Sequence, residues 1–290
     1  MDYRYYLNYC TFSYSMSVWT WDRWQKEIDW MALHGVNMPL QIIGLDVVWY
    51  KLLTEKLNYT TAEANNFIAG PCFQAWWGMN NLQGWGGPNP SWWYERQEQL
   101  CGKILSRERE LGMDPVLPGY AGMAPSDISS KGYSANNQGN WYTFVRPYIL
   151  DPNSTAFQTI SKLYYEELEK VMGTSTYYSM DPFHEGANTS GIDVPSAYKK
   201  IYEAMQSAKS DAKWVIQFWQ WSSEQYNVLS QVDQGKLIIL DLSSDCSPYF
   251  RKYNGHDSVY CILPNFGGST GIFGRLEASI NNYYTDIETY

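Results

Sequence analysis

This 290-residue chain has no long hydrophobic run, no cluster of basic residues and no glycine-rich motif that would hold a nucleotide. A membrane-spanning helix needs about 20 consecutive apolar residues, and no such run is present. Acidic residues outnumber basic ones by 30 to 21, which gives a net charge of −9. Because phosphate backbones are bound by clustered Lys and Arg, we expect neither a nucleic-acid partner nor a membrane span.

Motifs for metal binding and for a nucleophilic serine are also missing. The five cysteines are Cys10, Cys72, Cys101, Cys246 and Cys261. No two of them have CxxC spacing, and the three His form no zinc-type group with them, so we expect no metal and no cofactor. The chain contains no G-x-S-x-G elbow. The odd number of cysteines leaves at least one without a partner in the chain and indicates no particular compartment.

Aromatic residues are abundant: they make up 17% of the chain, with 14 Trp and 25 Tyr. Several Trp lie in stretches rich in Gly and Pro and outside periodic patterns: Trp76, Trp77, Trp85, Trp92 and Trp93. Aromatic faces presented from loops suit a flat, partly apolar ligand such as a sugar ring. The alternative is that these loops pack on one another as a small separate core.

Apolar strands alternate with amphipathic helices along the chain, and 44% hydrophobic residues suffice for a large core. Seven strands are predicted: Tyr3–Phe12, Val36–Ile43, Met113–Tyr120, Tyr177–Phe183, Trp214–Gln220, Lys236–Leu242 and Val259–Pro264. From the third strand on, their spacing favours parallel strands joined by crossover helices. We therefore predict an α/β fold, a (β/α)8 TIM-type barrel forming one domain over residues 1–290.

Helices are predicted from their apolar periodicity and their capping residues. The expected helices are Trp21–Leu33, Ser91–Leu111, a helix capped by Asn153 or Ser154 that ends at Gly173, Asp193–Ala208, Ser222–Val232, Pro248–Tyr253 and Gly271–Ile280. A long insertion over residues 44–90 follows the second strand and contains a short helix near Thr61–Ile68. Because it leaves the carboxyl end of a strand, this insertion is expected to overhang the active face of the barrel.

A closed barrel needs an eighth strand, and the pattern predicts only seven. The eighth position could be taken by the segment Asn281–Tyr290 or by a partner, or the barrel could be truncated. We favour truncation, which makes the barrel incomplete.

The fourth predicted strand ends in a group of acid and imidazole side chains. Asp181, His184 and Glu185 follow the apolar residues of this strand, and Gly186 lets the chain turn sharply behind them. In barrel enzymes the carboxyl ends of the strands carry the catalytic residues. Strict pleating would point His184 and Glu185 to opposite faces, so either His184 faces the helices or a bulge turns both inward. The alternative is an ordinary strand end made polar by solvent contact.

The carboxyl ends of the other strands add amides, aromatics and a few carboxylates. These residues are Asn8, Cys10, Tyr14, Gln41, Asp46, Tyr120, Gln217, Trp219, Trp221, Asp241, Asp245, Asn265 and Phe266. Lys and Arg are nearly absent from the set, which favours a neutral polyhydroxy ligand over a phosphate. Hydrolysis of a glycoside needs two carboxyl groups, and Glu185 suits the role of the acid. Asp241 or Asp245 could supply the second carboxyl group.

Several segments resemble the α-N-acetylglucosaminidases of glycoside hydrolase family 89. They are Tyr3–Tyr14, Trp24–Gly35, Gly70–Trp77, Gly112–Gly122, Asp181–Glu185 and Asn265–Gly268. The resemblance runs in order over nearly the whole chain. It implies a (β/α)8 catalytic barrel, between a small N-terminal domain and a helical C-terminal domain, that removes terminal α-linked N-acetylglucosamine from glycans as a retaining exo-enzyme. It also suggests a secreted, periplasmic or lysosomal location.

The resemblance assigns roles to individual positions. Glu185 matches the general acid/base of the family. The residues that match substrate-binding positions are Asn8, Cys10, Tyr14, Trp76, Trp141 and Trp219, with Asn265 and Phe266 in the seventh strand segment. His184 stands where lysosomal relatives have Asn, so its hydrogen bonding to the sugar is expected to differ. The acidic net charge favours neutral, mucin-type glycans over sulfated ones.

The family's nucleophile is a second glutamate, in a Met-Ala-Pro-Glu-Gly-like run after the seventh strand. No such run occurs here, and Glu277 lies in a helical pattern that does not match it. We therefore expect a fragment whose nucleophile and flanking domains lie outside it, and which is inactive or nearly so by itself. The alternative is a non-catalytic sugar-binding protein on a decayed barrel, which needs the Trp and Asn contacts but no carboxylate pair.

Overall fold

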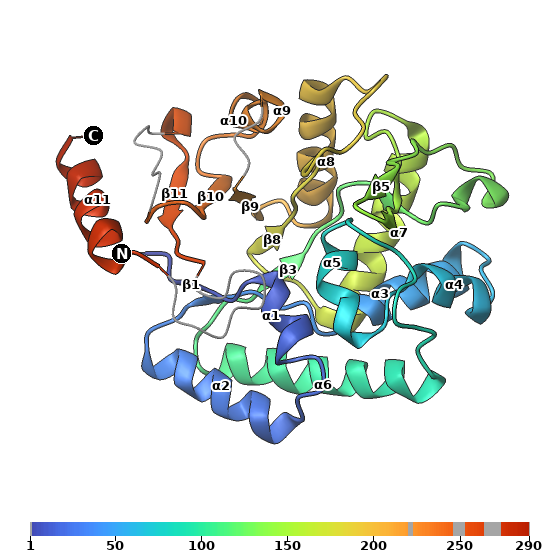
Figure 1. Cartoon of the computed structure of the whole chain (residues 1–290), viewed down its shortest axis with the longest axis horizontal. Coiled ribbons are helices and arrows are strands. Elements are labelled where there is room, and N and C mark those ends of the chain that lie inside the picture. Colours follow the sequence, from blue (N-terminus) through green and yellow to red (C-terminus); the bar gives the residue numbers. More distant parts are fainter. Residues whose placement is uncertain (1, 220–222, 246–252, 264–273, 290) are drawn as a thin grey trace.

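The computed structural model describes residues 2–219, 223–245, 253–263 and 274–289 (Figure 1). Seven strands are parallel and follow one another in chain order: β1 (Tyr5–Tyr6), β2 (Met38–Pro39), β3 (Val116–Pro118), β8 (Tyr177–Ser179), β9 (Lys213–Phe218), β10 (Leu237–Asp241) and β11 (Asp257–Tyr260). A parallel bridge from Leu40 to Val116 joins the β1–β2 pair to the five-stranded sheet. The seven predicted strands are therefore confirmed, although most are shorter than predicted.

The two edges of this curved sheet approach each other at the amino ends of the strands. Tyr3, just before β1, donates a hydrogen bond of 2.9 Å to the Asp257 carboxylate at the start of β11. Lys213 at the start of β9 donates to the same Tyr3 hydroxyl at 2.8 Å. Within the described residues no strand ladder joins β1 to β11, so the barrel is not closed there.

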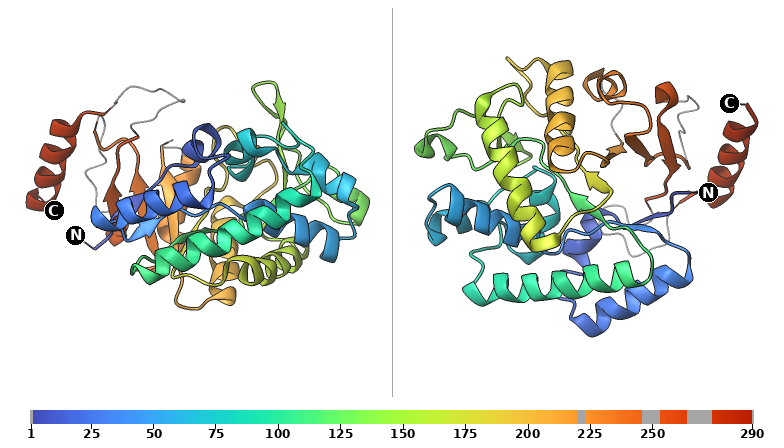
Figure 2. Two further views of the ribbon diagram at one scale, coloured as in Figure 1. Left: turned by 90° about the horizontal axis from the view of Figure 1, so that it is seen from below. Right: turned by 180° about the vertical axis from the view of Figure 1, so that it is seen from behind.

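Long helices cover the outside of the sheet: α2 (Trp21–Leu33), α6 (Ser91–Glu110), α7 (Thr155–Met172) and α8 (Val194–Ala208) (Figures 1 and 2). Their ends agree with the prediction to within two residues because their caps are visible in the sequence. Ser154 accepts a hydrogen bond from the backbone of Phe157, and Asp193 accepts one from Ser196. Strand β10 is completely buried.

The first predicted strand is wrong beyond Tyr6. The chain forms a helix there, α1 (Tyr9–Tyr14). Asn8 caps this helix, since its side chain accepts a hydrogen bond from the backbone N–H of Thr11 at 3.2 Å. Tyr, Phe and Thr favour strands by propensity, and here the cap and the tertiary packing override that preference.

Two predictions near the C-terminus are also corrected. The predicted helix Ser222–Val232 is two short helices, α9 (Ser223–Tyr226) and α10 (Val228–Gln231), separated at Asn227. The last helix, α11 (Leu276–Thr289), begins later and ends later than predicted. Segment 281–289 is therefore helical and does not supply an eighth strand. The predicted helix Pro248–Tyr253 lies outside the described residues except for Tyr253.

The insertion over residues 44–90 is mostly helical. It contains α3 (Leu45–Lys51), a π-helical turn (Leu52–Lys56), α4 (Thr61–Phe67), a 3-10 turn (Pro71–Phe73) and α5 (Gln74–Gly78). The helix predicted near Thr61–Ile68 is thus confirmed. The buried Asp46 carboxylate accepts hydrogen bonds from Trp93 Nε1 at 2.7 Å and from Gln74 Nε2 at 2.9 Å. It thereby ties α3 to α5 and α6, and α3 itself packs against α6 and α7.

A second excursion, over residues 119–150, links β3 to α7. Two small antiparallel ladders form in it, between β4 (Met123–Ala124) and β7 (Tyr148–Ile149) and between β5 (Asn140–Trp141) and β6 (Phe144–Val145). Sequence periodicity predicts no strand in this segment, because two-residue strands leave no detectable alternation.

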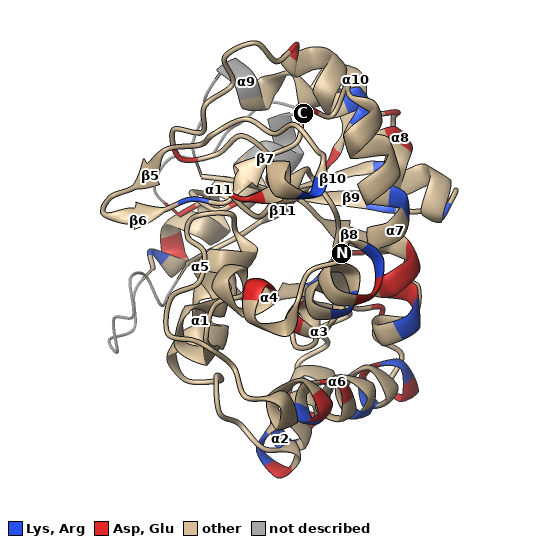
Figure 3. Ribbon diagram, turned by 90° about the vertical axis from the view of Figure 1, so that its right-hand side faces the viewer, with Lys and Arg blue, Asp and Glu red and all other residues tan. Residues whose placement is uncertain are grey.

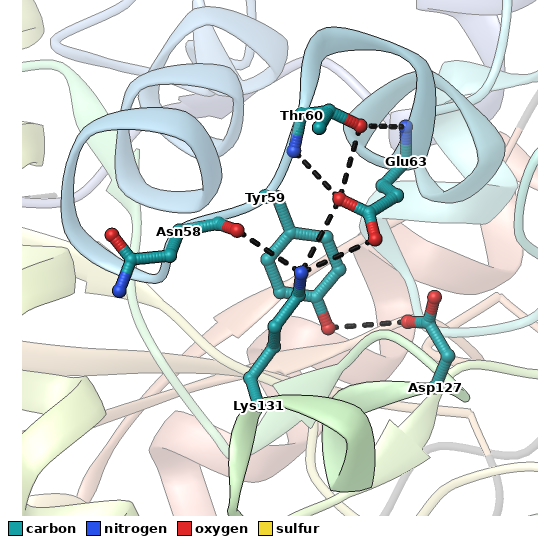
Figure 4. Close-up of polar contacts among 6 residues, drawn as sticks. All are labelled: Asn58, Tyr59, Thr60, Glu63, Asp127 and Lys131. Atoms are coloured by element: carbon teal, nitrogen blue, oxygen red, sulfur yellow. Dashed lines mark hydrogen bonds and ion pairs between the residues drawn. The ribbon is translucent and has the colours of Figure 1, made fainter.

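The two excursions are joined at Lys131, which follows β4 (Figure 4). Its ammonium group donates to the carbonyl of Asn58 at 3.0 Å and to the Glu63 carboxylate at 3.2 Å. The ring of Tyr59 lies under this ammonium group, and its hydroxyl donates to Asp127 at 3.1 Å. These contacts hold the two excursions against each other. No helix in the described ranges is both long and apolar enough to cross a membrane.

Candidate functional site

A cavity of about 600 Å³ opens at the carboxyl ends of the strands. Its walls come from α1, the insertion, the β5–β6 hairpin and the segments that follow β8, β9, β10 and β11. The lining residues are Asn8, Tyr9, Cys10, Tyr14, Phe73, Trp76, Met79, Asn81, Leu82, Trp141, Tyr142, Phe144, Glu185, Gln217, Trp219, Leu242 and Leu263. Eight of the predicted site residues are brought together here: Asn8, Cys10, Tyr14, Trp76, Trp141, Glu185, Gln217 and Trp219.

Helix α1 presents two of these residues on one face. Cys10 and Tyr14 are four residues apart, which places them one above the other on a helix. Tyr14 packs edge-on against Trp76 of α5, with ring centroids 5.2 Å apart. Burial, with a smaller effect of the Glu185 charge, raises the pKa of the Cys10 thiol to about 11, so this thiol is neutral at ordinary pH. It lines the wall as a small apolar group and not as a nucleophile.

Glu185 reaches the cavity because the chain leaves the strand geometry after Ser179. Phe183 and Glu185 both adopt left-handed backbone conformations, with φ of 58° and 49°. Such conformations are unfavourable for residues other than glycine and are concentrated at functional sites. The turn puts His184 Nδ1 4.0 Å from Glu185 Oε2, so the two neighbours do not point to opposite faces as strict pleating requires. The Glu185 side chain is 29% exposed, and so it is accessible from the cavity.

Two residues that no sequence motif singles out hold Glu185 in place. Asn81, only 1% exposed, donates a hydrogen bond of 2.5 Å from Nδ2 to Glu185 Oε2. Arg146 is 2% exposed and donates from Nη2 to the backbone carbonyl of Glu185 at 2.5 Å. Burial lowers the pKa of Arg146, and the charge of Glu185 opposes this shift. Both residues lie in irregular segments, where sequence periodicity carries no information about direction.

His184 lies behind the cavity wall and does not line the cavity. Its Nε2 donates to the carbonyl of Met79 at 2.5 Å, and its ring is tilted against Trp219 with centroids 5.2 Å apart. Burial lowers the pKa of His184 to about 4, with the charge of Glu185 opposing the shift, so the imidazole is neutral at ordinary pH. This position favours an indirect role, supporting Glu185 and Trp219, over the direct sugar contact that the sequence predicted.

Asp181 also lies one layer below the cavity. Its carboxylate accepts hydrogen bonds from the backbone N–H of Gln217 at 2.7 Å and from Gln217 Nε2 at 2.9 Å. Burial raises the pKa of this carboxyl group to about 6, although the two hydrogen bonds lower it. It faces a smaller cavity of about 60 Å³, which Tyr9 and His184 also line. Asp181 therefore fixes the Gln217 amide, which does line the main cavity.

The other candidate carboxylates do not line the cavity. Asp241 accepts a hydrogen bond from the Tyr253 hydroxyl at 2.9 Å, and Asp245 accepts one from the backbone of Arg275 at 3.1 Å. Among the residues that the structure describes, Glu185 is the only carboxylate on the cavity wall. The predicted residues Asn265 and Phe266 lie outside the described residues, as does Trp221.

The described side chains include no group of three or more His, Cys, Asp or Glu placed to hold a metal ion. The four described cysteines carry free thiols: Cys10, Cys72, Cys101 and Cys261. Among the residues described, the cavity wall thus offers one carboxyl group, several amides and many aromatic faces.

Parallel strands in chain order, helices outside them and a carboxylate-bearing cavity at their carboxyl ends together define a domain of the TIM-barrel type. The family model described as "Alpha-N-acetylglucosaminidase (NAGLU) tim-barrel domain" matches residues 4–289. The chain belongs to this family, as the resemblance of its segments predicted.

Individual relatives agree with this assignment. The chain is 38% identical to human alpha-N-acetylglucosaminidase over 95% of its own length and 40% of the human protein. It is 37% identical to a family 89 glycoside hydrolase from Clostridium perfringens, solved in complex with 2-acetamido-1,2-dideoxynojirmycin. The TM-score is 0.88, over 92% of this chain and 31% of the bacterial one. A variant of the bacterial enzyme with two Glu-to-Gln changes, in complex with its substrate GlcNAc-α-1,4-galactose, gives the same TM-score over 93% of this chain and 32% of that one.

Proposed function

We propose that this chain is the catalytic barrel of a retaining exo-glycosidase that releases terminal α-linked N-acetylglucosamine from glycans. The observation that carries the proposal is the placement of Glu185 on the wall of an aromatic cavity in a chain of this family. The cavity volume, about 600 Å³, lies within the range of small-ligand sites. The names of the relatives support the sugar: the human protein is an alpha-N-acetylglucosaminidase, and the bacterial variant binds GlcNAc-α-1,4-galactose as its substrate.

In this mechanism Glu185 is the general acid/base. Its carboxyl group first protonates the oxygen of the leaving group and then, as the carboxylate, deprotonates the attacking water. Asn81 holds Oε2, and Arg146 holds the backbone of the same residue, so the carboxyl group keeps one orientation during both steps. A retaining enzyme needs a second carboxylate at about 5–5.5 Å as its nucleophile.

We propose that the second carboxylate, like the flanking domains, is supplied by a part of the protein other than residues 1–290. Glu185 is the only carboxylate on the wall among the described residues. The substrate complex of the bacterial relative was obtained with two glutamates replaced, which fits a pair of catalytic glutamates. The chain spans about 40% of the human relative and about a third of the bacterial one.

We propose a secreted, periplasmic or lysosomal location on the resemblance alone.

The cavity suits a neutral sugar. Its described lining contains no Lys or Arg, because the guanidinium group of Arg146 is buried against the backbone of Glu185. Aromatic side chains contribute much of the wall, and the amides of Asn8, Asn81 and Gln217 can bond to hydroxyl and acetamido groups. A neutral, mucin-type glycan therefore fits the wall better than a sulfated one.

The test is hydrolysis of an aryl α-N-acetylglucosaminide by the protein that contains this chain, and by its Glu185→Gln variant. We expect Glu185→Gln to lower kcat/KM on a natural disaccharide by about 10²- to 10⁴-fold, because the leaving oxygen is no longer protonated. Azide should accelerate the variant on the aryl substrate, since this anion attacks the glycosyl-enzyme without the general base that water needs, and it gives a glycosyl azide as the product. A wild-type protein that binds N-acetylglucosamine without hydrolysing any glycoside would instead favour the sugar-binding alternative.

A further inference from the structure

The β5–β6 hairpin projects from the body of the molecule (Figures 2 and 3), and it contributes residues to the cavity wall. Its ladder pairs Trp141 with Phe144 and Asn140 with Val145, which leaves a turn of only two residues, Tyr142 and Thr143. Tyr142 is the first of these and has a φ of 52°. A two-residue hairpin with a positive φ at its first turn position normally has glycine there. The hairpin carries a large aromatic residue at a position where glycine is favoured.

The hairpin is held firmly at its base. The backbone N–H of Gln83, in the insertion, donates to the carbonyl of Val145 at 3.1 Å, and Arg146 N–H donates to Gly139 O at 3.1 Å. Phe144 packs edge-on against Trp85, with centroids 5.0 Å apart. A fixed base means that the strained turn holds its tip in one place. Because the rest of the hairpin is well packed, the unfavourable backbone conformation of Tyr142 indicates that its side chain has a function.

Tyr142 lines the cavity and yet is 84% exposed. Its neighbour Trp141 is half-buried and packs edge-on against it at 5.1 Å. Farther in, Asn81 is 1% exposed and contacts Glu185. Tyr142 therefore lies at the mouth of the cavity, whereas Glu185, which is 29% exposed and bonded to the buried Asn81, lies farther in.

We propose that Tyr142 forms part of a binding subsite for the leaving-group sugar, the residue to which the terminal N-acetylglucosamine is linked. This inference rests on the proposed function. In an exo-enzyme the terminal sugar occupies the deep part of the cavity, and the next sugar extends past the acid/base toward the mouth. The ring of Tyr142 offers an aromatic face that can lie on the C–H face of a pyranose there, while its hydroxyl stays in water. The strain at the turn is kept because only a side chain with a ring supplies this surface.

The experiment compares two substrates in the protein that contains this chain. GlcNAc-α-1,4-galactose has a sugar in the leaving group, whereas α-N-acetylglucosaminyl fluoride has none. We expect Tyr142→Ala to lower kcat/KM for the disaccharide about 3- to 30-fold more than for the fluoride. Tyr142→Phe keeps the ring, so its ratio of kcat/KM for the disaccharide to kcat/KM for the fluoride should lie within about twofold of the wild-type ratio. Trp92→Ala removes an aromatic that is 56% exposed and lies outside the cavity, and it should leave the ratio as in the wild type.

Tyr142→Gly separates the ring from the backbone. It should show the same selective loss on the disaccharide as Tyr142→Ala, but with a melting temperature at or above that of the wild type, because glycine accepts the left-handed turn. Equal losses on both substrates, or no loss on either, would overturn the subsite. A wild-type protein inactive on both substrates would count against the proposed function itself, and the subsite would fall with it.

Discussion

At the scale of single residues, the orientation of Glu185 depends on groups from distant parts of the chain. Asn81 comes from the insertion, Arg146 from the second excursion and His184 from the same turn. A carboxyl group that must give and then take a proton at one oxygen works best when its position is fixed by such neighbours. This makes Asn81, which touches the carboxylate itself, the most informative position to change.

Replacing Asn81 should alter both the rate and its pH dependence. We expect Asn81→Ala to lower kcat/KM about 10- to 100-fold, because the hydrogen bond that orients the Glu185 carboxyl group is lost. Asn81→Asp places a second carboxylate against Glu185, and two such groups resist ionising together. The alkaline limb of the pH profile of kcat/KM should therefore move to higher pH. Gln83→Ala is the control, since its amide bonds Ser126 and not Glu185. An unshifted limb in Asn81→Asp would contradict the contact.

At the scale of elements, the cavity wall depends on how the insertion is attached to the barrel. Helix α5 carries Trp76, and α5 is attached through Gln74 to the buried carboxylate of Asp46. Burial raises the pKa of Asp46, while its hydrogen bonds to Trp93 and Gln74 lower it. Burying this carboxylate costs free energy, and these hydrogen bonds offset that cost.

Removing the Asp46 carboxylate should weaken both the fold and the site. Asp46→Ala leaves Trp93 Nε1 and Gln74 Nε2 without their acceptor, which should cost about 2–4 kcal/mol of unfolding free energy. Asp46→Asn keeps one acceptor oxygen and should cost about half as much. Urea denaturation measures both values. Because α5 loosens, KM for the sugar should rise more than kcat falls. A variant as stable as the wild type would show that the three helices are joined by packing alone.

Sequence patterns predicted these elements unevenly, for physical reasons. The long helices α2, α6, α7 and α8 were found because an apolar stripe and a cap define each one. Helix α1 was missed although Asn8 caps it, because six residues are too few to show a helical period. Asn81 and Arg146 could not be found from the pattern, since loops position them through contacts with residues far away in the chain. Glu185 was found because strand ends gather at one edge of a parallel sheet.

At the scale of the whole molecule, folding brings acidic groups into the barrel that an unfolded chain would leave in water. Asp181 lies where the ends of β8 and β9 meet the cavity, and burial raises its pKa from 3.8 to about 6. The folded protein therefore holds a proton on this group at a pH where the unfolded chain has released it. Its contribution to stability is present below pH 3.8 and is lost as the pH rises through about 6.

The pH dependence of global stability tests this assignment when the wild type is compared with Asp181→Asn, which cannot titrate at this position. The difference in unfolding free energy, wild type minus variant, should fall by up to about 3 kcal/mol between pH 4 and 6 and stay constant above pH 7. The net charge of −9 gives the whole chain a separate loss of stability at high pH, but both proteins share it, so the difference cancels it. Urea titrations at several pH values supply the measurement. If the difference in unfolding free energy does not change between pH 4 and 7, Asp181 is as ionised in the folded protein as in the unfolded chain. Its hydrogen bonds to Gln217 would then fully offset the effect of burial on its pKa.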